Sequence, residues 1–286
     1  MHPQQIKHLS SALTEPVLSF SSISGGDTAE AWRVHTAQET YFAKTGLTDI
    51  SNTFACEANG LSALRGAKSG LVIPKVKAWG SGFLVLEWLA SIPPSPSDHA
   101  ALGRGLAQLH QAINPEQALG YGYPMQNFIG RTPQHNEWHE TWPSFFAEQR
   151  LQAMAERCRR ADRWSANWES AFYALCNALP QILPTRPDAS LLHGDLWHGN
   201  VYFSRNGPAL IDPAVYYGHR EADLAMTALF GGFSPVFYTA YNEIWPLEAG
   251  FSERRAIYNL YHLLNHLLLF GSSYAGSVAT ILKEFG

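Results

Sequence analysis

Hydrophobic and polar residues alternate in short runs along the first 90 residues, a pattern typical of β-strands, with one helix among them. Ala31–Thr36 and Thr40–Lys44 are rich in β-branched and aromatic residues around a polar turn, which predicts a hairpin. Apolar residues at helical spacing predict a helix over Ser51–Gly66. Lys75–Trp79 and Phe83–Trp88 are expected to be two more strands, because a Gly-Ser-Gly turn separates them. The N-terminal part is therefore expected to be a small, mainly β lobe.

Ser91–Ser97 is the clearest break in this pattern. It holds three prolines in four positions, and neither a strand nor a helix continues through such a run. We therefore predict a domain boundary between residues 1–90 and residues 91–286. Beyond it the apolar spacing is mainly helical, so the chain as a whole is predicted to be α+β. The helices are expected over Asp98–Ile113, Trp142–Cys158, Trp164–Leu183, Glu221–Phe230 and Arg254–Phe270, with a long loop at Asn114–Trp138 and short β-like segments at Leu191–Val201 and Pro208–Ile211.

The composition indicates a folded protein with a sizeable core. Of the 286 residues, 46% are hydrophobic and 13% are aromatic, which excludes a disordered chain. The formal net charge is −4 and the sequence pI is about 6.3, whereas nucleic-acid-binding domains usually carry a basic excess. We therefore expect no nucleic-acid partner, and the sequence favours no particular oligomeric state.

The expected compartment follows from the cysteines and the apolar segments. Cys56, Cys158 and Cys176 form no paired motif, which favours a reducing compartment. The N-terminus lacks the hydrophobic segment of a secretion signal. The most apolar stretch, Leu260–Phe270, is interrupted by polar residues and is too short to span a bilayer. We therefore expect a cytoplasmic protein with no membrane partner.

The strongest chemical signal is the segment Leu191–Asn200, which reads LLHGDLWHGN. In it, Asp195 is followed five positions later by Asn200. Phosphoryl transfer to a hydroxyl needs a carboxylate that orients the nucleophile and takes its proton. It also needs oxygen ligands that hold a metal ion against the nucleotide phosphates. Asp195 would supply the carboxylate, and Asn200 would supply part of the metal site.

A second carboxylate, Asp212, stands at the end of a short apolar strand. A charge at that place is costly unless it faces a cation or a polar cleft. Asp195, Asn200 and Asp212 together therefore predict a site for ATP and Mg²⁺. The alternative is that Asp195 and Asn200 are turn residues and that Asp212 caps a helix, because both residue types favour such places.

The N-terminal part would then supply the clamp for the nucleotide. Gly25, Gly26 and Asp27 stand between two strand-like segments, where glycines let backbone N–H groups approach a phosphate, although a simple hairpin turn would use the same residues. Lys44 ends a predicted strand, and Glu57 lies near the start of a predicted helix. A strand lysine paired with a helix glutamate presents its ammonium group to the α- and β-phosphates. Each of the two charges alone would be read as a surface residue.

Glu87, Trp88 and Leu89 close the last predicted strand, just before the proline-rich break. The backbone at this place in a kinase-like hinge would meet the adenine ring. An edge strand that ends in a loop predicts the same three residues, so the assignment to the adenine site depends on the rest of the site.

Taken together, these motifs resemble the fructosamine kinase (ketosamine-3-kinase) family, a branch of the aminoglycoside-phosphotransferase and choline-kinase-like group. Many members of the wider group carry His-Gly-Asp, a downstream Asn and then an Asp. Trp197, Ile211–Ala214, Tyr217–Ala225 and Asn127–Gln134 are more particular to the fructosamine kinases. The resemblance covers roughly residues 20–275, which is nearly the whole chain.

The resemblance implies a two-lobed, protein-kinase-like fold and a role for each candidate residue. Asp195 would be the catalytic base, Asn200 and Asp212 the metal ligands, and Lys44 with Glu57 the phosphate-binding pair. The residues that would cover the nucleotide are Gly25, Gly26, Asp27 and Thr28.

The implied reaction uses ATP and Mg²⁺ to phosphorylate a hydroxyl of a ketosamine, the rearranged adduct of a sugar on an amine. The phosphorylated adduct falls apart and frees the amine, so the enzyme would repair glycated proteins or small amines. Trp197, Asn127 and His193 are expected on the acceptor side. One alternative is a kinase of the same fold that acts on an aminoglycoside, choline or an amino acid. A pseudokinase that only binds nucleotide is disfavoured, because the proposed catalytic residues are all present.

Overall fold

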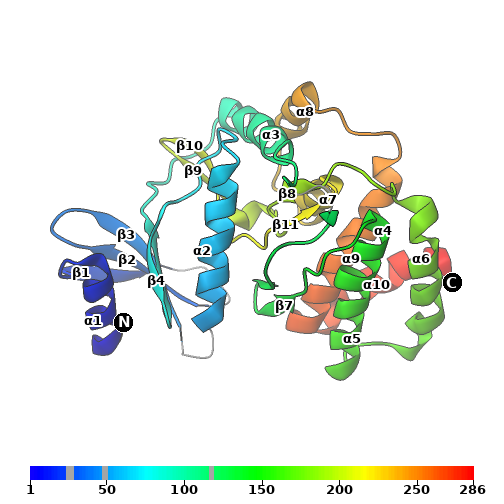
Figure 1. The fold of residues 1–286 in the computed structure, drawn as a ribbon, viewed down its shortest axis with the longest axis horizontal. Helices are drawn as coiled ribbons and strands as arrows, with labels where there is room; N and C mark the ends of the chain where they lie inside the picture. The colour runs from blue at the N-terminus through cyan, green and yellow to red at the C-terminus, as the bar shows by residue number, and fades with distance from the viewer. Residues whose placement is uncertain (24–28, 47–50, 116–118) are drawn as a thin grey trace.

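The computed structural model describes residues 1–23, 29–46, 51–115 and 119–286. A β-rich N-terminal part lies at one end of the molecule, and helices fill the other end, with helix α2 between them (Figure 1). This arrangement confirms the predicted α+β class with a small β-rich lobe and a larger helical lobe. The predicted boundary segment, residues 91–97, follows strand β5 and runs into the first turn of helix α3, which begins at Pro96, and the division at that point stays a prediction.

The N-terminal lobe is a five-stranded antiparallel sheet in the order β1-β2-β3-β5-β4. Hairpin connections explain most of this order, because β1 pairs with β2, β2 with β3 and β4 with β5. The strands are β1 (Ser19–Ile23), β2 (Glu30–His35), β3 (Thr40–Thr45), β4 (Val76–Gly80) and β5 (Phe83–Glu87). The β2–β3 hairpin and the β4–β5 pair confirm the strands predicted from the sequence.

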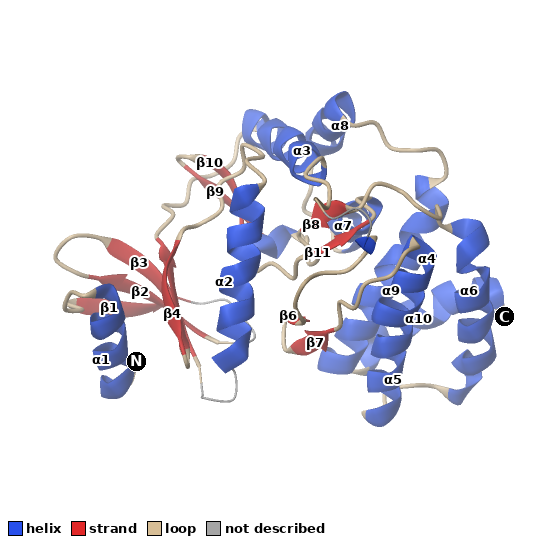
Figure 2. Cartoon of the chain, in the orientation of Figure 1, coloured by secondary structure: helices blue, strands red, loops and turns tan. Residues whose placement is uncertain are grey.

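The two faces of this sheet pack against different helices. Side chains alternate between the faces of a strand, and in β5 Val85 joins a small cluster with Leu9 of helix α1 (Pro3–Leu13). Its neighbours Leu84 and Leu86 join the main core together with helix α2 (Ser51–Gly66). The predicted bounds of α2 agree with the structure, and the helix links the sheet to the second lobe (Figure 2).

The C-terminal lobe is built mainly from helices around a continuous aromatic and aliphatic core. Trp142 is fully buried at its centre and packs on Phe145, Phe146 and Tyr258. The helices are α3 (Pro96–His110), α4 (Trp142–Phe145), a π-helix at Phe146–Gln152, α5 (Ala153–Arg160), α6 (Glu169–Ile182), α7 (Glu221–Leu229), α8 (Pro235–Ile244), α9 (Phe251–Phe270) and α10 (Ala275–Leu282), with 3₁₀ turns at Ala166–Trp168, His198–Asn200, Ser272–Tyr274 and Lys283–Phe285.

Three two-stranded ribbons interrupt these helices and carry the polar residues of interest. β8 (Ser190–Leu192) pairs with β11 (Tyr216–Gly218), and β9 (Val201–Ser204) pairs with β10 (Gly207–Leu210). The third ribbon pairs β6 (Asn127–Ile129) with β7 (Thr132–Gln134). It lies inside the segment that the sequence predicted to be one long loop, so that prediction was wrong over these residues. Strands of three residues around a two-residue turn are too short to show an alternating pattern.

Among the residues described, no helix combines the length and the apolar character that crossing a membrane requires.

Close packing of α3 on α8 depends on a glycine. A Cβ atom at Gly103 would lie 2.2 Å from the Phe237 carbonyl oxygen and 3.0 Å from the Tyr241 amide nitrogen, both of them backbone atoms of α8. A side chain at this position would therefore push the two helices apart.

We expect Gly103→Ala to lower the free energy of unfolding by about 1–3 kcal/mol, because overpacking a close helix contact strains the backbone. The matched control is Gly276→Ala in α10, where nothing lies within 4 Å of the added Cβ. That variant should be neutral, or more stable by up to about 1 kcal/mol, because alanine favours a helix over glycine. Urea titrations followed by circular dichroism measure both, and equal effects in the two variants would contradict the packing argument.

Candidate active site

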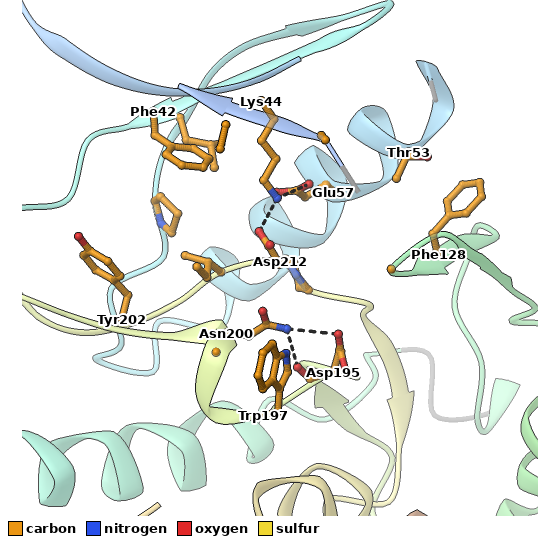
Figure 3. A pocket seen from close by; sticks show the side chains of 18 of the residues that line it. Phe42, Lys44, Thr53, Glu57, Phe128, Asp195, Trp197, Asn200, Tyr202 and Asp212 are labelled. Atoms are coloured by element: carbon orange, nitrogen blue, oxygen red, sulfur yellow. Dashed lines mark hydrogen bonds and ion pairs between the residues drawn. The ribbon is translucent and has the colours of Figure 1, made fainter. Parts of the chain in front are cut away.

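A cavity of about 950 Å³ opens between the sheet and the helical lobe. Its N-terminal wall comes from β2, β3, β5 and α2, and its other wall from β6, residues 195–213 and the end of α9. Figure 3 shows Lys44 and Glu57 on the first wall and Asp195, Asn200 and Asp212 on the second. Ten of the predicted site residues line it: Lys44, Glu57, Glu87, Trp88, Leu89, Asn127, Asp195, Trp197, Asn200 and Asp212. Gly25, Gly26, Asp27 and Thr28 lie outside the described residues.

Lys44 bridges the two walls of this cavity. Its Nζ donates to both carboxylate oxygens of Glu57 on α2, at 2.9 and 3.0 Å, and to Oδ1 of Asp212 at 2.5 Å (Figure 3). Burial alone would lower the pKa of Lys44, but the two carboxylates outweigh burial and hold that pKa above its ordinary value. The lysine is therefore a fixed positive charge at neutral pH, as a group that binds phosphate must be.

Asn200 and Asp212 meet because of the β9–β10 hairpin. Asn200 directly precedes β9 and Asp212 follows β10 by two residues, so the open end of an antiparallel pair brings them together. The Ile211 amide donates to the Asn200 carbonyl at 3.1 Å and closes this end. In Figure 3 the side-chain oxygen of Asn200 points toward Asp212. Asp212 has a φ of 55°, an uncommon backbone conformation that aims its carboxylate into the cavity.

Asp195 stands on the same loop as Asn200. The Asn200 amide Nδ2 donates to the Asp195 carbonyl at 2.8 Å and to its carboxylate Oδ2 at 3.3 Å, so the two side chains orient each other. Burial, and then the negative charge of Asp212, raise the pKa of Asp195 to about 7. A carboxylate with a pKa near neutrality is a stronger base than an ordinary aspartate, which suits a group that takes a proton from a hydroxyl.

The loop that carries Asp195 is held from behind by Asp223 of α7. The Asp223 carboxylate accepts the backbone N–H groups of His193 at 2.7 Å and Gly194 at 2.9 Å, and it pairs with His110 Nε2 at 3.1 Å. Burial opposes ionisation, but the hydrogen bond and charge of His110 and the other donors lower the pKa of Asp223 below its ordinary value. It is therefore a carboxylate that fixes the loop backbone.

The backbone conformation of this loop requires a glycine at position 194. The φ of Gly194 is 82°, and a Cβ atom there would lie 2.0 Å from the Ala214 carbonyl oxygen. The glycine of the His-Gly-Asp sequence thus lets the loop that carries Asp195 approach the segment that follows Asp212.

His193, which we expected on the acceptor side, lies behind the loop and outside the cavity lining. Its ring is fully buried: Nε2 donates to the Ile211 carbonyl at 2.9 Å, and Nδ1 accepts from the Asp195 amide at 3.3 Å. Burial lowers its pKa, which keeps the ring neutral. The histidine therefore joins the loop of Asp195 to the strand end of Asp212.

The N-terminal wall offers a flat apolar slot. Ala31, Phe42 and Leu86 line it, and Glu87, Trp88 and Leu89 close its far edge. The Arg33 guanidinium lies 4.7 Å from the centre of the Trp88 ring, which fixes that ring on the rim. This is the part of the cavity suited to a planar aromatic base.

The opposite part of the cavity is lined by residues of the C-terminal lobe. Trp197 lies within the loop between Asp195 and Asn200, and Gly199 makes room for its ring, because a Cβ at Gly199 would lie 2.4 Å from the indole. The end of α9 completes this wall with Asn265, His266, Leu269 and Phe270, none of which we had predicted as site residues. The polar residues that interrupt the apolar stretch Leu260–Phe270 were the signal for them.

Asn127 lines the cavity, yet its amide is used inside the protein. Nδ2 donates to the Val215 carbonyl at 2.8 Å, while Oδ1 accepts from Gln134 at 2.9 Å and from Asn136 at 2.8 Å. These contacts tie the β6–β7 ribbon to the segment that follows Asp212, which is the same segment that contacts Gly194.

Comparison with known proteins places this geometry in a family. The fructosamine kinase family profile matches residues 1–285. The chain belongs to the fructosamine kinase family. A protein of Vibrio parahaemolyticus named "Probable ketoamine kinase" is 38% identical, over 88% of this chain and 87% of its own. A rice protein, Oryza sativa subsp. japonica, named "Protein-ribulosamine 3-kinase, chloroplastic" is 36% identical, over 94% and 79% of the two chains.

Solved structures agree with the fructosamine kinase assignment. The crystal structure of a candidate fructosamine-3-kinase from Haemophilus somnus superposes with a TM-score of 0.89 at 28% identity, covering 99% of this chain and 98% of that one. An aminoglycoside phosphotransferase in complex with gentamicin gives a TM-score of 0.68 at 13% identity over 100% and 96% of the two chains, which reflects the fold alone. The predicted protein-kinase-like fold and the predicted family are both confirmed.

The role of Asp223 in this kinase can be tested by an isosteric change. Asp223→Asn offers one acceptor oxygen to two backbone N–H groups, so a buried donor is left without a partner, at a cost of about 1–3 kcal/mol. We expect kcat for phosphoryl transfer to fall on the order of 100-fold, because a small displacement of the base has an effect of that size. The KM for ATP should change little.

The control for this prediction is Asp98→Asn, at the N-terminal cap of α3, where the carboxylate accepts from Ser95. That change should reduce stability without affecting kcat. Steady-state kinetics on both variants, at matched folded fractions, separate positioning from stability, and parental turnover in Asp223→Asn would remove Asp223 from the mechanism.

Proposed function

We propose that this member of the fructosamine kinase family transfers the γ-phosphoryl group of ATP to a sugar hydroxyl of a ketosamine. The observation that carries the proposal is the convergence of the Lys44–Glu57 pair, the Asp195–Asn200 pair and Asp212 on one cavity. The ketoamine kinase and ribulosamine 3-kinase names of its relatives support the choice of acceptor.

Residues on the two walls of the cavity would have different roles in the reaction. Asp195 would accept the proton of the acceptor hydroxyl. The hydroxyl oxygen bonds to the γ-phosphorus, while the bond between the γ-phosphorus and the oxygen that stays on ADP breaks. Asn200 would keep the Asp195 carboxylate in one orientation through its amide N–H. Lys44, charged and fixed by Glu57, would hold the phosphates of the nucleotide.

Asn200 and Asp212 fit a magnesium ion. Their side-chain oxygens face one space, and Mg²⁺ prefers oxygen ligands, typically one or two from the protein with the rest from phosphates and water. The ion would neutralise charge on the transferring phosphoryl group. The small number of protein ligands is what a Mg²⁺–nucleotide site needs, since the substrate completes the coordination.

The nucleotide would lie along the N-terminal wall. Glu87, Trp88 and Leu89 would meet the adenine at the edge of the apolar slot. Gly25, Gly26, Asp27 and Thr28 would cover the phosphates. This part of the proposal rests on the family resemblance together with the placement of Lys44.

On the acceptor side, we assign Trp197 to the sugar, because its ring lies beside the base on the cavity wall. Asn127 would act by holding the β6–β7 ribbon in place, and His193 by holding the loop, since the polar atoms of both are used internally. The phosphorylated ketosamine would then break down and release the amine, which makes the activity a deglycation repair. Cys56, Cys158 and Cys176 are free thiols, and we place the enzyme in the cytoplasm.

An acceptor screen tests the proposed activity. ATP-dependent phosphorylation would be measured for a ribulosamine, a fructosamine, choline and an aminoglycoside. We expect the two ketosamines to react and the other two to be ignored, because a site that hydrogen-bonds the hydroxyls of a keto-sugar discriminates against acceptors that do not present hydroxyls in that arrangement. Asp195→Asn is the control for catalysis at this site, and it should lower kcat by about 10²–10⁴-fold with ATP binding nearly intact. A faster reaction with choline or the aminoglycoside would refute the assigned acceptor.

The metal site has a separate test. Asp212→Ala should abolish the Mg²⁺-dependent tightening of ATP binding, because it removes the carboxylate that would hold the ion against the phosphates. Calorimetry of ATP binding with and without Mg²⁺ measures this, with Asp188→Asn, a change outside the cavity lining, as the comparison variant. A parental response to Mg²⁺ in Asp212→Ala would place the ion elsewhere.

A further inference from the structure

The proposed function leaves open which amine carries the sugar. One residue of the cavity wall, Arg131, indicates the class of this amine. We propose that Arg131 binds a carboxylate on the amine part of the ketosamine, so that the acceptor class is sugar adducts of amino acids or short peptides. The inference rests on the proposed function, because it concerns the same site.

Arg131 occupies the tip of the β6–β7 ribbon. Ile129 pairs with Thr132, so the turn consists of Gly130 and Arg131 alone. Gly130 has a φ of 59°, the left-handed conformation that a two-residue hairpin turn needs and that glycine adopts most easily. Both turn residues line the cavity together with Phe128. The arginine therefore stands on the cavity wall and is exposed to solvent at the same time.

The ribbon under Arg131 is braced by buried hydrogen bonds. Thr132 donates to the Asn265 Oδ1 of α9 at 2.6 Å, and Tyr261 of α9 donates to Gln134 Oε1 at 2.8 Å. Gln134 Nε2 in turn donates to the Ala214 carbonyl at 2.9 Å. Groups that are buried and fully hydrogen-bonded hold one arrangement. The hairpin tip is consequently a rigid platform.

The same bracing fixes the ribbon relative to the catalytic loop. The Ala214 amide donates to the His193 carbonyl at 2.8 Å, two residues before Asp195. A single backbone residue, Ala214, thus contacts both the ribbon that carries Arg131 and the loop that carries the base. Because the ribbon is fixed relative to the loop, the arginine at its tip can select a ligand group by the position of that group. An arginine on a flexible surface segment cannot do this.

The charges on this wall favour an acceptor with an anion at its outer end. Among the described lining residues of the C-terminal wall, the acids are Asp195 and Asp212, which are assigned to the base and the metal, and the permanent cation is Arg131. The planar guanidinium matches a carboxylate in a two-pronged contact.

The different depths of Asp195 and Arg131 in the cavity indicate which end of the acceptor each residue contacts. Asp195 is partly buried and must meet the sugar hydroxyl, whereas Arg131 is exposed. The sugar therefore lies inward, and the amine substituent points outward toward the hairpin tip. An adduct of an α-amino acid carries its carboxylate on the carbon next to the amine, at this outer end. A sugar phosphate would instead carry its anion at the sugar end.

The experiment compares three acceptors with the parent enzyme and two variants. The acceptors are ribulosyl-glycine, its neutral isostere ribulosyl-glycinamide, and ribulosyl-glycinamide 5-phosphate. The test variant is Arg131→Gln. The control is Arg205→Gln, because Arg205 is also exposed at the tip of a two-stranded hairpin, β9–β10, but lies outside the cavity lining. The quantity measured is kcat/KM for each acceptor at low and at high ionic strength.

We expect the parent and Arg205→Gln to favour the glycine adduct over the glycinamide adduct by about fivefold at low salt, the size typical of a solvent-accessible ion pair. Added salt should reduce this ratio. In Arg131→Gln the ratio should be close to one, and the KM for ATP should match that of the parent. The ratio within each protein cancels differences in overall activity between the proteins, and comparing the ratios of the parent and Arg131→Gln cancels any intrinsic difference between the acceptors.

Three outcomes would overturn the inference. The first is equal use of the two adducts by the parent, and the second is a preference that persists in Arg131→Gln. The third is a preference for the phosphate-bearing acceptor that depends on Arg131, which would assign the arginine to the sugar end. No phosphorylation of any ketosamine would refute the proposed function itself, an outcome distinct from the other three.

Discussion

The ion pairs of Lys44 with Glu57 and Asp212 hold together parts of the chain that are far apart in sequence. Lys44 is on the third strand of the sheet, Glu57 on α2 and Asp212 at the end of the β9–β10 hairpin. Both carboxylates contact the ammonium group of Lys44. If the sheet, the helix α2 or the segment that carries Asp212 shifted alone, a charge inside the protein would lose its partner. Breaking a buried pair such as Lys44–Glu57 costs about 3–5 kcal/mol, a substantial fraction of the roughly 5–15 kcal/mol by which a domain is stable.

Next to the Lys44 ion pairs, the loop that carries Asp195 is fixed mainly through its backbone. Asp223 receives two amide groups of the loop, and Ala214 contacts both the loop and the β6–β7 ribbon. Two buried residues behind the cavity lining, Asp223 and Ala214, thus hold the backbone that carries the lining side chains. Such an arrangement lets the acceptor side vary on a rigid support without disturbing phosphoryl transfer.

The sequence predicted the elements that have a strong local pattern and missed those defined by tertiary contacts. The hairpin of β2 and β3 and the helix α2 were predicted because strand alternation and helical spacing are visible within ten to sixteen residues. Helices α8 and α10 were not predicted, since they are short and α10 begins with small residues. The motif Tyr217–Ala225 was recognised as typical of the family, but nothing in its spacing indicated that Asp223 accepts hydrogen bonds from the catalytic loop. The division at residue 90 and the nucleotide contacts of Gly25–Thr28 stay predictions.

The neutral ring of His193 works as a spacer of fixed width. One ring nitrogen donates to the Ile211 carbonyl and the other accepts from the Asp195 amide, so both edges of the imidazole are occupied by the two halves of the site. An aromatic ring has no internal torsion, so the separation between the base and the strand end that carries Asp212 cannot drift as a flexible side chain would allow. A charged ring would present a second N–H to the Asp195 amide, and burial disfavours that state. The distance between the Asp195 amide and the Ile211 carbonyl therefore depends on the width of one imidazole ring.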